Sequence, residues 1–135
     1  MYHKISMIGR VGHDPEIKPT HSGLQVTTFS VAIDIYGKNK DQKVTIWPRI
    51  TVFGSVADFV IGHVKKGDLV LVEGRLSPDP ETGAPKLFYN KKNGFYGTAY
   101  DIIGEKVQLL SSKRYAETPA KSTESNWECP SFFDF

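Results

Sequence analysis

Hydrophobic and polar residues alternate most regularly between residues 43 and 53. Successive residues of a strand point to opposite sides, so this segment has one aliphatic face and one face of a different kind. The aliphatic face is expected to join a core. The other face offers aromatic rings, a cation and small hydroxyls, and it consists of Thr45, Trp47, Arg49, Thr51 and Phe53.

Other strands are predicted where β-branched and aromatic residues gather between turn signals. Gly9 and Gly12 are expected to relieve strain at a bend or bulge, Asn93-Gly94 favours a hairpin turn, and Gly104 indicates a further bulge or kink. Residues 19–23, 37–42 and 78–85 are expected to be turns or loops. The predicted strands are 2–9 with a continuation over 13–18, 24–36, 43–53, 68–76, 86–90, 95–100 and 98–110.

A short helix is predicted after residue 54, where the hydrophobic period changes. Ser55 to Asp58 resembles a capping box, two lysines at 65 and 66 complement the negative helix end, and Gly67 supplies a left-handed stop. Three strands, a helix, and two more strands with a hairpin arm form the element order of a five-stranded Greek-key barrel, the OB-fold. We therefore predict an all-β fold with one short helix. A sandwich is the less favoured alternative.

Composition divides the 135 residues into one domain over 1–110 and a tail over 111–135. The tail is rich in Ser, Thr, Lys, Glu and Pro without periodicity, which predicts disorder. Its aromatic end indicates a tip that binds partner proteins, and an incidental frayed end is the alternative. The predicted tip residues are Trp127, Phe132, Phe133, Asp134 and Phe135.

The net charge of +2 hides an asymmetry between the body and the tail. Residues 1–114 carry 16 Lys and Arg against 11 Asp and Glu, whereas the last 21 residues carry one Lys and four acids. A basic body suits a polyanionic ligand, although a solvated basic surface has the same composition. Aromatic rings beside cations on the 45–53 face favour single-stranded nucleic acid, because every base has a π-face and every linkage a charge. A second core layer or a subunit contact is the alternative for these rings.

Catalysis, metal and cofactor binding are not expected. Cys129 is the single cysteine, the four histidines show no ligand spacing, and carboxylates close in sequence are few, with Asp14 and Glu16 as one such pair. A metal-dependent nuclease is therefore disfavoured. Neither a signal peptide nor an apolar run of membrane-spanning length is recognisable, so we expect a soluble cytoplasmic protein that contacts no membrane.

Residues 4–16 resemble the opening of bacterial-type single-stranded DNA-binding proteins, including the Gly-x-x-Gly-x-Asp-Pro-Glu pattern that begins at Gly9. The similarity continues through 29–32, 47–54 and 66–76, so it covers residues 2–76 well and 97–110 loosely. It implies an OB-fold, single-stranded DNA binding in replication, recombination and repair, and a homotetramer. It also implies replication and repair proteins as partners of the tail tip, although of that family's acidic Asp-Ile-Pro-Phe ending only Phe135 keeps its place.

The resemblance also implies roles for individual residues. Family residues that match Trp47 and Phe53 stack on bases, and those that match Lys4, Arg49 and Lys66 lie along the path of the strand. Tyr36 stands one position before a family tryptophan, and Pro48 replaces a histidine that is common near a subunit interface. The predicted DNA-binding set is completed by Arg10 and Arg75, and by Lys86, Phe88, Tyr89, Lys91, Lys92 and Tyr96 on the hairpin arm.

Three alternatives remain open. The arm's aromatic residues could pack on the barrel or on a neighbouring subunit. The same fold could serve as a protein-interaction adaptor of the primosomal accessory type, although such proteins usually lack an aromatic tail tip. Stacking on bases does not report the 2′-hydroxyl, so single-stranded RNA is an alternative ligand.

Overall fold

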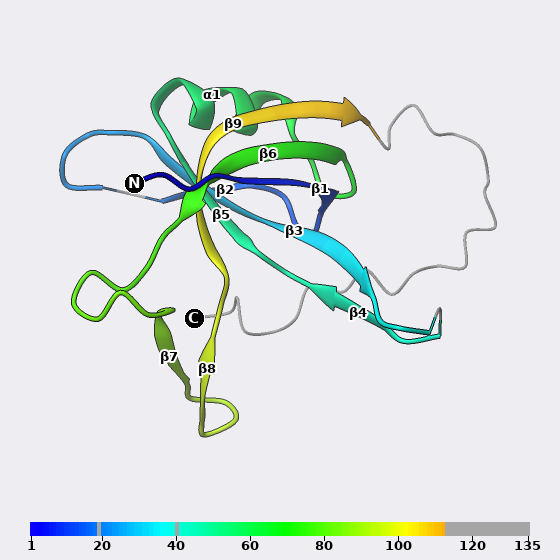
Figure 1. Cartoon of the computed structure of the whole chain (residues 1–135). Coiled ribbons are helices and arrows are strands. Elements are labelled where there is room, and N and C mark those ends of the chain that lie inside the picture. The colour runs from blue at the N-terminus through cyan, green and yellow to red at the C-terminus, as the bar shows by residue number, and fades with distance from the viewer. Residues whose placement is uncertain (19, 40, 113–135) are drawn as a thin grey trace.

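The computed structural model describes residues 1–18, 20–39 and 41–112. Ser111, which the prediction assigned to the tail, is the last residue of a strand. The predicted disorder of residues 113–135 and the predicted tail tip lie outside the described residues. Figure 1 shows the arrangement of the elements. They are β1 (Ile5–Val11), β2 (Glu16–Lys18), β3 (Val26–Tyr36), β4 (Lys43–Ile46), β5 (Arg49–Phe53), α1 (Gly54–His63), β6 (Leu69–Leu76), β7 (Leu87–Asn90), β8 (Phe95–Thr98) and β9 (Asp101–Ser111).

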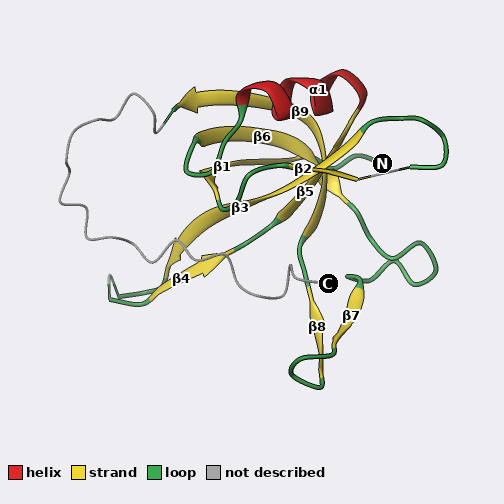
Figure 2. Ribbon diagram, turned by 180° about the vertical axis from the view of Figure 1, so that it is seen from behind, coloured by secondary structure: helices red, strands yellow, loops and turns green. Residues whose placement is uncertain are grey.

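Five strands close into a ring in the order β1, β6, β9, β5 and β3, and β3 returns to β1 through the pairs Arg10↔Ala32 and Val11↔Val31. The β5–β9 pair is parallel and the other pairs in the ring are antiparallel. The short strands β2 and β4 pair alongside the two ends of β3. This ring with its single helix, seen from behind in Figure 2, is the arrangement of an OB-fold and confirms the predicted fold class.

The core fills the inside of this ring. Ile50 and Val52 of β5 are fully buried, whereas Arg49 and Thr51 are only partly buried, as the period of two requires. Ala57 and Val60 of α1 are also fully buried in this cluster. The strand residues of the core are Val11, Phe29, Val31, Ile50, Val52, Val70, Val72 and Ile102.

The predicted strand over residues 43–53 is wrong in one respect, because it divides into β4 and β5 at Trp47-Pro48. Pro48 has no N–H for a strand ladder, but its carbonyl accepts a hydrogen bond from the Val31 N–H at 3.1 Å. β4 pairs only with β3, on a hairpin that extends beyond the ring (Figure 1). Val44 is therefore 63% exposed instead of joining the core.

The ends of the helix also differ from the prediction. Phe53 is the N-cap and no side chain caps the first turn, so the capping box is wrong. The helix ends at His63, and Gly67 takes its positive φ of 89° in the following turn, which the Asp68 N–H closes onto the Lys65 carbonyl. Gly67 therefore ends a turn and not the helix.

The predicted irregularity at Gly104 is confirmed. Glu73 pairs with Lys106 and Gly74 pairs with Gly104, which leaves Glu105 as the extra residue of a bulge. The hairpin arm is also confirmed: β7 and β8 pair with each other and form a sheet separate from the ring. Gly94 supplies the positive φ of 72° in its turn, and we call residues 86–98 the arm.

Candidate nucleic-acid interface

The predicted aromatic and cationic face lies on the outside of the ring. Ile50 and Val52 point into the core, so Arg49, Thr51 and Phe53 point outward from β5. The Phe53 side chain is partly accessible, with 39% of its surface exposed. We call Trp47, Arg49, Thr51 and Phe53 the outer face.

Trp47 is partly buried at the break between β4 and β5, and its ring lies against Gly12. A Cβ atom at Gly12 would lie 2.7 Å from Trp47 Cζ3 and 2.8 Å from Ser30 Oγ. Gly12 thus leaves the space in which the indole ring sits. The ring keeps some accessible surface on the outer face, which is what stacking on a base requires.

The two glycines of the Gly-x-x-Gly pattern provide space, not backbone freedom. Neither Gly9 nor Gly12 is among the glycines with positive φ, and β1 pairs with β6 without a register shift. The predicted strain relief and bulge are therefore wrong. A Cβ atom at Gly9 would clash with the Ala32 carbonyl oxygen, so Gly9 permits the close approach of β1 and β3.

Asp14, the acidic residue of the same pattern, holds the turn that follows α1. Its Oδ1 accepts a hydrogen bond from the Lys66 N–H at 2.9 Å. The Gly67 N–H donates to the Val11 carbonyl at 2.8 Å, and Arg10 Nη1 donates to the Gly67 carbonyl at 3.0 Å. These bonds bring Lys66 and Arg10, both predicted to contact the ligand, to the same end of β1.

The predicted cations differ in how far they are already paired. The Lys4 ammonium lies 3.0 Å from the Glu73 carboxylate, and this hydrogen-bonded pair raises the pKa of Lys4 and lowers the pKa of Glu73. Arg75 lies 3.9 Å from Glu105. Phosphate must compete with these carboxylates, so Lys4 and Arg75 offer less free charge than their sequence positions indicate.

Other predicted cations have weaker partners or none. Lys86 Nζ lies 3.4 Å from Ser77 Oγ. Within residues 1–18, 20–39 and 41–112, the ammonium groups of Lys66 and Lys91 form no ion pair or hydrogen bond. Because Lys66 and Lys91 are exposed, their charges are available to a polyanion.

The arm presents aromatic side chains on both of its faces. Tyr89 and Tyr96 are paired across the strands with ring centroids 5.2 Å apart, and they are 51% and 76% exposed. Phe88 instead packs on Gly97, where a Cβ atom would lie 2.9 Å from Phe88 Cζ. Phe95, which the predicted set omitted, is 74% exposed. The sequence signal that could have identified Phe95 is its place directly after the predicted Asn93-Gly94 turn, where it lies opposite Asn90.

Tyr36 is 63% exposed near the end of the β3–β4 hairpin, opposite Lys43. The structure therefore places predicted rings on three elements: Tyr36 on the hairpin, Trp47 and Phe53 on the outer face, and the two tyrosines on the arm. Such separated rings suit an extended ligand better than a compact one.

Within the described residues, no group of three His, Cys, Asp or Glu side chains could hold a metal ion. In the same part of the chain, no helix is long and apolar enough to cross a membrane.

The family model and the relatives that match this chain agree on one family. The model of the single-strand binding protein family matches residues 2–110. The chain is 34% identical over 113 residues to a single-stranded DNA-binding protein of Neisseria meningitidis, covering 82% of this chain and 60% of that protein. A protein of the same name from Xanthomonas axonopodis is 30% identical over 113 residues, covering 82% of this chain and 58% of that protein. One from Thermotoga maritima is 45% identical over 78 residues, covering 56% of this chain and 55% of that protein. The chain thus spans about 60% of the length of such relatives.

Proposed function

Because the chain belongs to the single-strand binding protein family, we propose that it binds single-stranded DNA without sequence preference. The observation that carries this proposal is the outer face, where Trp47 is seated on Gly12 just before β5 and Phe53 lies at the end of β5. Exposed rings stack on any base, and cations attract any phosphate, so the surface offers affinity without base readout. The proposal invokes no catalytic step.

The binding track that we propose runs from the outer face to the arm. Phe53, Tyr89 and Tyr96 supply exposed rings, and Lys66 and Lys91 supply charges that no described residue pairs with. The relatives named single-stranded DNA-binding protein support the same ligand. A titration with oligo-dT, oligo-U and duplex DNA of matched length tests the proposal. We expect oligo-dT to bind more tightly than duplex DNA, and a clear preference for oligo-U would favour RNA as the ligand.

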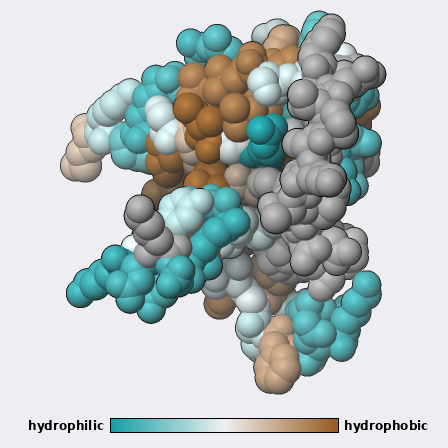
Figure 3. All heavy atoms as spheres, turned by 90° about the vertical axis from the view of Figure 1, so that its right-hand side faces the viewer, coloured by the Kyte–Doolittle hydropathy of each residue, from teal (hydrophilic) through white to brown (hydrophobic). Residues whose placement is uncertain are grey.

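We propose that the chain forms a homo-oligomer, a tetramer by family resemblance. Among the described residues, Ile5 to Gly9 of β1 pair only with β6, which leaves the second edge of this strand segment unpaired. Ile8 is 54% exposed beside this edge. Figure 3 shows hydrophobic surface on the side of the molecule toward which β1 runs. Free strand edges with apolar neighbours favour pairing with a second chain.

A glutamate at position 8 is expected to lower the oligomer mass, because it places a charge on the proposed contact surface. Light scattering coupled to size-exclusion chromatography measures that mass for Ile8→Glu. Ile17→Glu is the matched control, since Ile17 is 59% exposed on β2, which pairs with β3 and not with the Ile5–Gly9 segment of β1. Equal masses for the native protein and both variants would remove β1 from the contact.

We also propose that the tail tip recruits replication and repair proteins to DNA in the cytoplasm. The last 21 residues carry one Lys and four acids, so they repel phosphate, and their aromatic residues suit an apolar pocket on a partner. This part of the proposal rests on the sequence of residues 115–135 alone.

Removal of residues 127–135 is expected to abolish partner capture while DNA affinity stays unchanged or becomes slightly tighter at low salt. Pull-downs from host extract on immobilised oligo-dT compare the full chain with the truncated one. A charge-preserving control replaces Phe132, Phe133 and Phe135 with alanine, and it is expected to lose the same proteins. An identical set of captured proteins for all three forms would remove the recruitment role.

A further inference from the structure

The arm leaves the ring through two chain segments that meet beside Arg49. Ser77 directly follows β6, and Tyr100 directly precedes β9. The Ser77 N–H donates to the Asp101 carbonyl at 2.9 Å, and the Arg49 N–H donates to the Tyr100 carbonyl at 2.8 Å. Both connections of the arm are therefore held close to β5. We call Ser77, Tyr100 and Asp101 the arm root.

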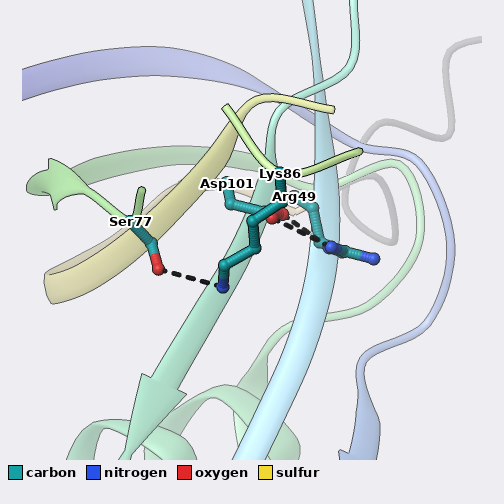
Figure 4. A network of polar contacts seen from close by, with 4 residues as sticks. All are labelled: Arg49, Ser77, Lys86 and Asp101. Carbon is teal, nitrogen blue, oxygen red and sulfur yellow. Dashed lines mark hydrogen bonds and ion pairs between the residues drawn. The ribbon is translucent and has the colours of Figure 1, made fainter. Parts of the chain in front are cut away.

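Side chains reinforce the arm root. Arg49 and Asp101 face each other in the parallel β5–β9 register. Arg49 Nε donates to Asp101 Oδ1 at 2.7 Å, and Arg49 Nη2 donates to Asp101 Oδ2 at 3.0 Å. Lys86, at the start of the arm, adds the contact of its Nζ with Ser77 Oγ at 3.4 Å. Figure 4 shows these four side chains together, with the Arg49 fork directed at the Asp101 carboxylate.

This pairing changes what Arg49 can contribute to binding. The Asp101 side chain is only 9% exposed and the Arg49 side chain 30%, so the carboxylate neutralises the guanidinium in a largely desolvated position. A phosphate that approached Arg49 would have to displace Asp101 and leave its carboxylate partly buried without a partner, which is unfavourable. Lys66 and Lys91 carry no such cost.

We propose that Asp101 is a positioning residue, which fixes the Arg49 fork and the arm root so that Tyr89 and Tyr96 are set at a defined place relative to Trp47. Arg49 then acts in nucleic-acid binding through the arm and not as a phosphate ligand. This inference rests on the proposed binding of single-stranded DNA.

The first test needs no DNA. Asp101→Asn keeps the shape of the side chain but places an amide N–H₂ group against an Arg49 donor. We expect faster hydrogen exchange at the Ser77 amide and in β7 and β8, measured on the full chain. Thr45→Val is the control, because it removes a side-chain hydrogen bond to Asp34 on the other hairpin and is expected to leave Ser77 unchanged. Unchanged exchange at Ser77 in Asp101→Asn would overturn the positioning role.

The second test measures oligo-dT affinity in two backgrounds. In the native chain, we expect Asp101→Asn to weaken binding about tenfold, because displaced rings lose stacking. In a chain that carries Tyr89→Ala and Tyr96→Ala, the same change is expected to cost less than about twofold, because the positioned rings are gone. An equal loss in both backgrounds would show that Asp101 does not act through these rings, and the inference would fail.

The third test separates positioning from phosphate contact. Arg49→Lys keeps the charge but cannot form the two-pronged bond, so we expect it to weaken binding as much as Asp101→Asn does. Arg49→Met with Asp101→Leu removes a neutral pair and is expected to leave the slope of log K against log salt unchanged. Near-native affinity of Arg49→Lys, or a slope smaller by about 0.7 in the double variant, would identify Arg49 as a phosphate ligand.

Failure of the inference and failure of the proposed function give different results. If the native chain did not bind oligo-dT, the proposed function would fail, while hydrogen exchange would still report whether Asp101 fixes the arm root. If the native chain binds and exchange at Ser77 does not change, only the positioning role fails.

Discussion

Trp47→Ala is expected to weaken oligo-dT binding by about 1–3 kcal/mol, because the loss of one stacked base costs that much. The fold is expected to survive, since Trp47 is not part of the buried core and lies on the outside of the ring. Fluorescence anisotropy with labelled oligo-dT measures the affinity, and thermal unfolding followed by circular dichroism reports the stability.

Two variants sharpen this result. Gly12→Ala places a methyl group where the Trp47 ring now sits, so we expect it to displace the ring and weaken binding while the Trp47 side chain itself is retained. Tyr2→Ala is the matched control, because Tyr2 is 87% exposed and outside the proposed track. If Trp47→Ala unfolds the chain, or binds oligo-dT with native affinity, Trp47 is a packing residue and not a base contact.

The arm carries the second large expected effect. Replacing Tyr89 and Tyr96 together with alanine removes two exposed rings, and it is expected to cost about 1–3 kcal/mol for each ring that stacks on a base. The number of nucleotides covered per chain is expected to fall as well. Titration with oligo-dT of increasing length measures both quantities.

Leu87→Ala is the control for the arm, because Leu87 is 69% exposed and lies two residues before Tyr89 on the same face, but offers no ring. It is expected to bind as the native chain does. Should the double tyrosine variant keep its affinity and change its oligomer mass instead, the arm is an assembly element and the proposed track ends at the outer face.

Local patterns predicted the parts of the fold that local physics controls. The alternation of residues 49–53 was sufficient to separate the buried Ile50 and Val52 from the outward Arg49 and Phe53. One buried side of a strand imposes a period of two, whatever the rest of the chain does. The Asn93-Gly94 turn and the Gly104 bulge were also predictable locally, because glycine favours tight turns and marks bulges inside strands.

Features that depend on distant contacts were not predictable in this way. The role of Gly12 depends on a ring 35 positions away, since the glycine makes space for Trp47. The pairing of Arg49 with Asp101 joins residues 52 positions apart and arises because the register of β5 and β9 places them opposite each other. The sequence therefore marked Arg49 as a cation, and only the structure shows that its charge is already neutralised.

The direct test of base stacking on the outer face is the emission of Trp47 itself. A Trp127→Phe variant leaves Trp47 as the only tryptophan, because the chain has two. We expect its fluorescence to be quenched on titration with oligo-dT and to saturate at the same DNA concentration as the anisotropy of a labelled oligonucleotide. Anisotropy that reports binding while the Trp47 emission stays unchanged would contradict the account.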